Sequence, residues 1–131
     1  MIDLLDAIET VARRLATVAK RRDAGRKRDL IAARRELAIL TVTIMAEGES
    51  YTPITSDPQR YAELRRRISG LRSVIADHQA TWSAVSIDSD DAAYRAASAH
   101  VQDSAREFMR WIRAEVEATS DDTDGQGAAA R

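Results

Sequence analysis

Histidine is the residue with the widest chemical range in this chain, which has two of them, His78 and His100, and no cysteine. An imidazole can bind a metal, accept a phosphoryl group or transfer a proton near neutral pH. His78 lies in the stretch LRSVIADHQATW, one helical turn before Trp82. A phosphoryl-accepting histidine must be open to its donor, and Trp82 would crowd that approach. We therefore expect His78 to be a buried, neutral side chain that is hydrogen-bonded to a neighbouring helix.

The spacing of the other reactive residues does not match a metal or catalytic site. Di-iron bundles combine Glu-x-x-His pairs with further inward glutamates, and this chain has no Glu-x-x-His. His100 has Asp103 three residues later, but it lies beside the apolar stripe of its helix, so we expect it at the surface. The lack of cysteine excludes thiolate zinc sites and disulfides. With no Gly-x-Ser-x-Gly and no glycine-rich phosphate loop, we expect no catalytic residue, no cofactor and no enzymatic activity.

Four segments of the chain have apolar residues at steps of three and four, a spacing that predicts helices, and no segment alternates as a strand would. We expect these helices at about residues 3–23, 29–46, 58–85 and 89–118. Asp29 and Asp57 are placed to cap the second and third helices, and Pro58 suits the first position of the third. Residues 40–45 are apolar around most of the helix, so we expect that end of the second helix to be deeply buried.

The third segment has the clearest pattern, an unbroken seam of the kind that packs in helical bundles. The pattern predicts an all-α fold, an antiparallel up-down-up-down four-helix bundle over residues 1–119, followed by a disordered acidic tail at 120–131. A long first hairpin that pairs with a second copy of the chain is the main alternative. The seam residues are Tyr61, Leu64, Ile68, Leu71, Ile75, His78, Trp82 and Val85.

Charge is divided unevenly along the chain, although its net charge is only −1. Residues 1–72 carry 15 Lys and Arg against 10 Asp and Glu, whereas residues 73–131 carry 5 against 11, so the halves have net charges of +5 and −6. Ten of the basic residues fall between positions 13 and 35. The two halves can therefore attract each other within the fold, or present faces of opposite charge to partners.

The turn between the first two helices, KRRDAGRKRD, is a candidate binding surface for an acidic protein or for nucleic acid. No RNP-type aromatic set, zinc finger or helix-turn-helix accompanies it, and the whole chain is slightly acidic. We therefore favour a solvated, salt-bridged surface over a nucleic-acid interface. The candidate partner-binding residues are Arg21, Arg22, Arg26, Lys27 and Arg28.

Residues 37–121 resemble the hemerythrin-like cation-binding bundles, in which the second, third and fourth helices carry the metal ligands. TIMAEGESYTPI is similar to the end of the second helix, with Thr43 at the histidine position and Glu47 at the position of the bridging glutamate. DPQRYAELRRRISGL is similar to the start of the third helix, with Asp57 and Tyr61 at histidine positions. The resemblance implies a four-helix fold.

The fourth helix of that family is matched by FMRWIRAEVEATSD, with Glu115 in place of histidine and Ser120 near the aspartate. Every matched histidine is therefore replaced, and imidazoles are the ligands that hold and tune that metal pair. His78 falls on no ligand position of this match. What the resemblance leaves is an oxygen-only set, Glu47, Asp57 and Glu115, which suits a hard cation.

Protein–protein contact is the function that these observations favour. We expect a non-enzymatic adaptor or regulator that binds another protein or a second copy of itself, on a scaffold that has lost its metal. The alternatives are a small-ligand or cation site at His78 or at the three carboxylates, and nucleic-acid binding through residues 13–35. No apolar run reaches membrane-span length, MIDLLDAIET lacks the basic start of a signal peptide, and cysteine is absent. We therefore expect a cytoplasmic protein without a membrane partner.

Overall fold

The computed structural model describes the backbone of residues 2–129 and the side chains of residues 2–119. Within these residues the chain is all-helical and contains no strand, so the predicted all-α class is confirmed. No helix in this part of the chain is both long enough and apolar enough to cross a membrane. The helices are α1 (Ile2–Lys20), α2 (Arg26–Ser50), α3 (Thr52–Thr55), α4 (Pro58–Thr81) and α5 (Asp91–Ala129).

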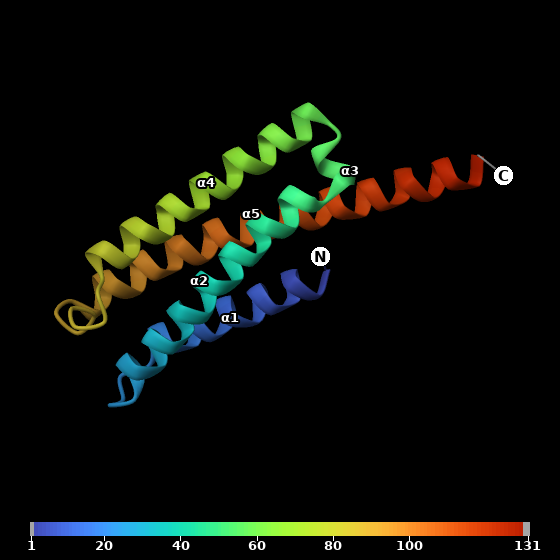
Figure 1. The fold of residues 1–131 in the computed structure, drawn as a ribbon. Helices are drawn as coiled ribbons and strands as arrows, with labels where there is room; N and C mark the ends of the chain where they lie inside the picture. The colour runs from blue at the N-terminus through green and yellow to red at the C-terminus, as the bar shows by residue number, and fades with distance from the viewer. Residues whose placement is uncertain (1, 130–131) are drawn as a thin grey trace.

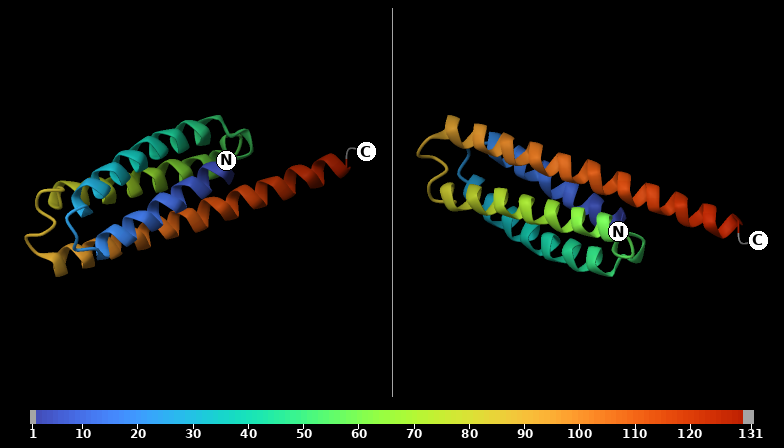
Figure 2. Two further views of the ribbon diagram at one scale, coloured as in Figure 1. Left: turned by 90° about the horizontal axis from the view of Figure 1, so that it is seen from below. Right: turned by 90° about the horizontal axis from the view of Figure 1, so that it is seen from above.

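Four long helices lie side by side, and α3 is a single turn between α2 and α4 (Figure 1). α1 packs along α2 and α5, and α5 also packs along α4. α3 contacts α2, α4 and α5, so it closes one end of the molecule. α5 extends beyond the other helices toward the C-terminus (Figure 2). α1 and α5 are thus the two helices that each pack against two other long helices.

The residues at the two ends of α4 explain where it begins and ends. Asp57 Oδ1 accepts hydrogen bonds from the backbone N–H groups of Gln59 and Arg60, at 3.0 and 3.3 Å, and Pro58 follows the cap, as predicted. The predicted end near residue 85 is wrong, because α4 ends at Thr81 with Trp82 as its C-cap. Val85 lies in the following turns and is 85% exposed, so the apolar seam stops at Trp82.

α2 is longer and more exposed than its sequence predicts. It begins at Arg26 with Gly25 as N-cap, so Asp29 lies in the first turn instead of capping the helix. Of residues 40–45, only Ile44 is fully buried, and Val42 is 67% exposed. The prediction that this end is deeply buried is wrong because α2 packs along α1 and α3 and has no neighbour on its outer side.

The other predicted boundaries shift by a few residues. α1 ends at Lys20, three residues before its predicted end, and residues 21–25 form the turn to α2. Asp90 Oδ1 accepts a hydrogen bond from the backbone of Ala93 at 3.1 Å, so α5 begins at Asp91, shortly after its predicted start. The backbone of α5 continues as helix to Ala129, past its predicted end near 118, and so runs through most of the segment predicted to be a disordered tail. Residues 130 and 131 lie outside the described residues.

The apolar core is divided into two clusters. The larger one, here the α3-end cluster, takes buried side chains from all five helices, among them Ile8, Ile54, Leu64 and Ile112. The smaller one, here the Tyr94 cluster, lies at the other end of the molecule, where the turn from α1 meets the loop before α5. It consists of Val18, Ala19, Leu30, Ile87 and Tyr94.

Candidate functional site

His78 lies on α4 against the Tyr94 cluster and is half-buried, as its place in the seam predicts. Its imidazole stacks on the ring of Tyr94, with the ring centroids 5.9 Å apart and an interplanar angle of 20°. Trp82 contacts the same tyrosine ring at 5.7 Å. Within the described residues the imidazole makes no hydrogen bond, so the bond expected to a neighbouring helix is absent. His78 is held by aromatic contact instead.

A small cavity of about 30 Å³ beside His78 is lined by Arg34, which makes no ion pair within the described residues. No aspartate or glutamate is among the residues that line it. Arg34 Nη2 is buried there without a hydrogen-bond partner, and burial lowers the pKa of this guanidinium. A polar space of this size can admit water or a small anion, which limits the small-ligand alternative to ligands of that size. Its polar lining residues are Arg34, His78, Gln79, Tyr94, Ser98 and Gln102.

The stability of the protein is expected to depend on the protonation of His78. Burial lowers the pKa of its imidazole from 6.5, and the positive charge of Arg34 lowers it further. The unfolded chain therefore binds this proton more tightly, so the neutral imidazole stabilises the fold fully above about pH 6.5 and stability falls as pH drops below that value. The free energy of unfolding, measured with urea at several pH values, should fall less steeply in acid for His78→Leu than for the wild type.

His100→Leu is the control for this experiment, because His100 lies on an exposed position of α5. It should leave the pH dependence of unfolding unchanged. His78→Leu should also stay folded, since it fills a half-buried seam position with an apolar side chain. An identical acid dependence in His78→Leu and the wild type would contradict the prediction.

The three carboxylates of the candidate oxygen-only site do not form a common cluster. Glu47 is exposed on α2. Asp57 and Glu115 are joined through Arg60, whose Nε lies 3.7 Å from Asp57 Oδ2 and 3.5 Å from Glu115 Oε2. A guanidinium thus stands where a cation would have to bridge these two carboxylates. Among the described residues, no group of three or more histidines, aspartates or glutamates is placed to hold a metal ion.

Most residues of the predicted basic surface are paired with carboxylates of the same chain. The Arg21 guanidinium, which hydrogen-bonds Asp23, lowers the pKa of that carboxyl to about 2. Arg28 is the exception, because its side chain is 86% exposed and its contact with Asp29 is as long as 4.0 Å. Carboxylates of the turn itself and of the acidic half of the chain therefore neutralise much of this surface together. The pairs are Arg21 with Asp23 and Asp29, Arg22 with Asp91, and Lys27 with Asp88.

Arg26, the fifth residue of the predicted basic surface, is buried and only 3% exposed. Its Nη1 lies 2.9 Å from Asp91 Oδ1 and 3.3 Å from Asp88 Oδ1. Its Nη2 donates to the backbone carbonyl of Ala19 at 3.2 Å, and the guanidinium lies 5.0 Å from the ring centroid of Tyr94. Arg26 therefore joins the end of α1, the start of α2 and the start of α5.

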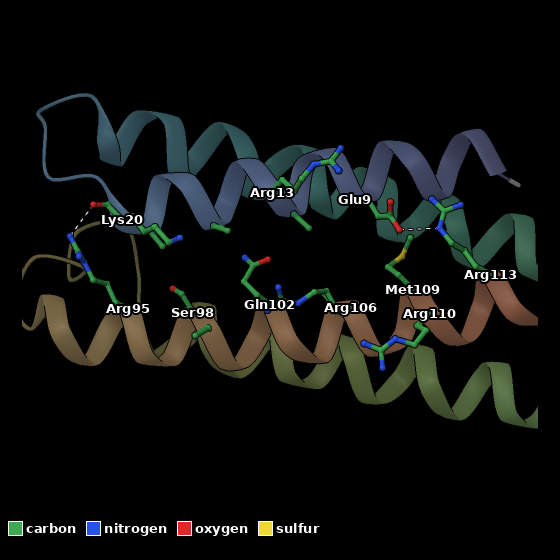
Figure 3. A pocket seen from close by; sticks show the side chains of 15 residues that line it. Glu9, Arg13, Lys20, Arg95, Ser98, Gln102, Arg106, Met109, Arg110 and Arg113 are labelled. Carbon is green, nitrogen blue, oxygen red and sulfur yellow. Dashed lines mark hydrogen bonds and ion pairs between the residues drawn. The ribbon is translucent and has the colours of Figure 1, made fainter.

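A groove of about 950 Å³ runs between α1 and α5, on the side of the molecule shown in Figure 3. It exists because the facing side chains are small. Ala12, Ala16 and Ala19 follow one another at steps of four and three on α1 and so lie on one face. On α5, Ser98 and Ala105 face them, and these short side chains leave the space between the helices unfilled.

The rim of this groove is basic. Six cations line it, and three of them pair with carboxylates: Arg95 with Asp91, Arg106 with Asp103, and Arg113 with Asp6 and Glu9. The other three make no ion pair within the described residues. Two interactions join the walls at the two ends: Arg113 Nε pairs with Glu9 Oε1 at 2.9 Å, and Arg95 donates to the Lys20 carbonyl at 2.9 Å (Figure 3). These two interactions connect α1 and α5 at both ends of the groove. The cations are Arg13, Lys20, Arg95, Arg106, Arg110 and Arg113.

The sequence pattern does not predict this groove, although it contains a signal for it. The alanines of α1 recur at helical spacing beside the apolar stripe, and α5 carries Ser98 and Ala105 seven residues apart, at the same heptad position. Small residues at such positions also occur where helices pack closely. Sequence spacing cannot distinguish close packing from a groove, because that depends on the distance between the two helices.

Comparison with known proteins does not place the chain in a family. No protein-family model matches it, and no curated protein or solved structure shows significant similarity to it. The functional proposal below therefore depends on the geometry of the groove.

Proposed function

We propose that this protein acts through protein–protein contact, as an adaptor or regulator, and that the α1/α5 groove receives an acidic amphipathic helix of a partner. The observation that carries the proposal is the combination of a hollow of about 950 Å³, a floor of small side chains and a rim on which Arg13, Lys20 and Arg110 make no ion pair within the described residues. A partner helix can lay its apolar face on such a floor. The rim cations then attract its acidic flanks and orient it.

The scaffold in this proposal is an antiparallel up-down-up-down bundle of α1, α2, α4 and α5. The contacts of α1 with α2 and α5, and of α5 with α4, support it. We propose that the bundle shares its layout with the hemerythrin-like proteins but has exchanged metal ligands for other roles. Asp57 caps a helix and pairs with Arg60, which also pairs with Glu115, and Thr43 donates to a backbone carbonyl of its own helix.

The proposal predicts selective binding of an acidic amphipathic helix. The probe is a fluorescent designed peptide of about 20 residues, long enough to form a helix, with an Ala/Leu stripe and Glu on its other face. In fluorescence anisotropy it should bind the protein, and a peptide with Lys in place of each Glu should not. Arg13→Glu and Arg110→Glu, on opposite walls of the groove, should each weaken binding by roughly tenfold.

Arg72→Glu is the matched control, because it makes the same charge change at an exposed position of α4 outside the groove. It should bind the acidic peptide like the wild type. Ala16→Phe fills the floor and should abolish binding while circular dichroism shows an unchanged helix content. Equal losses in Arg72→Glu and Arg110→Glu, or equal binding of the two peptides, would mean that overall charge attraction and not the groove accounts for binding.

A further inference from the structure

α2 carries an apolar stripe that no other part of the described chain covers. Ile31, Ile39 and Val42 are 47%, 61% and 67% exposed, and Ala38 and Ala46 are exposed beside them. These residues share the face opposite the one that α2 buries in the core, together with the exposed Arg35, which lies one turn after Ile31 and one turn before Ile39. Large aliphatic side chains that line up on an exposed helix face mark a contact surface.

The stripe is complementary to itself when a second α2 lies antiparallel to it. We place a two-fold axis perpendicular to the two helices, level with the midpoint between Ala38 and Ile39. Each residue then lies opposite the residue of the second copy that is equally far from this midpoint on its other side. Ile39 of one copy then meets Ala38 of the other, and Ile31 meets Ala46. Ile39 and Ile31 thus each face an alanine. Val42 faces the exposed Arg35 of the other copy, whose aliphatic stem can lie against it while the guanidinium reaches solvent.

Charge favours the same antiparallel register. α2 begins with a basic turn and ends with Glu47 and Glu49, neither of which makes an ion pair within the described residues. The two-fold axis places Arg28, whose side chain is 86% exposed, opposite Glu49 of the second copy, at both ends of the contact. A parallel arrangement would instead set like charges side by side.

We propose that the protein is a homodimer with two-fold symmetry, formed by antiparallel packing of the α2 stripe on the α2 stripe of a second copy. The contact runs from Arg28 to Glu49, which is about 32 Å of helix at a rise of 1.5 Å per residue. It is isologous, so both copies contribute the same residues. The stripe shares no residue with the α1/α5 groove, so the dimer carries two separate grooves.

Sedimentation velocity over a wide range of concentration tests the dimer. The 14.5 kDa chain should sediment as a species of twice that mass at high concentration. Ile39→Glu should make it monomeric with unchanged helix content, because the side chain is exposed. Val42→Arg should do the same, because it places a second positive charge opposite Arg35 of the other copy. Val85→Glu is the control: it places the same charge on an exposed valine outside the stripe and should leave the dimer intact.

Cysteine crosslinking tests the register, because the chain has no cysteine of its own. Ala38→Cys places the two thiols next to the two-fold axis, so oxidation should give a disulfide-linked dimer. Ala46→Cys, at an equally exposed alanine, should not crosslink, since residue 46 of one copy lies opposite residue 31 of the other. In a parallel pair both variants would crosslink.

Charge exchange gives a further test of the register. Glu49→Arg should weaken dimerisation roughly tenfold, and the double variant Arg28→Glu with Glu49→Arg should restore it. A monomer at every concentration, a dimer that Ile39→Glu leaves intact, or equal crosslinking through positions 38 and 46 would overturn the proposal. Because the stripe and the groove share no residue, the Ile39→Glu monomer should still bind the acidic peptide. The two proposals can therefore fail independently.

Discussion

Replacing Arg26 with methionine is expected to lower the free energy of unfolding by about 3 kcal/mol, the loss typical of removing one partner from a buried ion pair. Arg26 is 3% exposed, and its guanidinium contacts Asp91, Asp88 and the Ala19 carbonyl. Methionine has a similar length and can occupy the same space beside Tyr94. The change therefore removes the charge and the hydrogen bonds while most of the packing is kept.

Urea and thermal unfolding measure this effect, which should lower the melting temperature by roughly 10 °C. Arg22→Met is the matched control, because Arg22 also pairs with Asp91, at 3.4 Å, but its side chain is 76% exposed. It should change stability by less than about 0.5 kcal/mol. If Arg26→Met were as stable as the wild type, the contacts of the guanidinium would only offset the cost of burying it.

Replacing Tyr94 with alanine is expected to lower the free energy of unfolding by about 4 kcal/mol. Tyr94 is 1% exposed, and its ring contacts His78, Trp82 and Arg26 at once. Removing the ring leaves a cavity where three elements meet: the end of α4, the start of α2 and the start of α5. The loss combines the burial of the ring with its aromatic and cation–π contacts.

Two variants separate the contributions to this effect. Tyr94→Phe keeps the ring and should cost less than about 1 kcal/mol, because the Tyr94 hydroxyl makes no hydrogen bond within the described residues. Tyr61→Ala removes a half-buried tyrosine from α4 and should cost clearly less than Tyr94→Ala. Equal losses from Tyr61→Ala and Tyr94→Ala in urea unfolding would show that Tyr94 does not have the central role assigned to it.

Residues that act within their own helix were predicted well from the sequence. Asp57 and Pro58 start α4 as expected, because a cap depends on neighbours two and three residues away. Leu64 and Ile68 are buried as the seam requires. The inward position of His78 also followed from its spacing, whereas its aromatic partner did not, because Tyr94 lies on another helix.

The candidate sites were predicted only in part. Arg26 and Arg28 lie two residues apart in the same basic run, yet one is buried and the other is 86% exposed. The groove between α1 and α5 depends on small residues beside the apolar stripes, and their spacing does not show whether the two helices pack closely there. The exposed stripe around Val42 has the same spacing as a buried one. In each case the outcome depends on which neighbouring helix is present and on its distance.

The sequence by itself determined the helical class and the start of α4, because periodicity and capping act over a few residues. Tertiary structure alone decided the burial of Arg26, the stacking of His78 on Tyr94, the opening of the α1/α5 groove and the exposure of the α2 stripe. The physical reason is that a helix with apolar residues on more than one face has several ways to bury them. Only the placement of its neighbours determines which face is covered and which stays open to a partner.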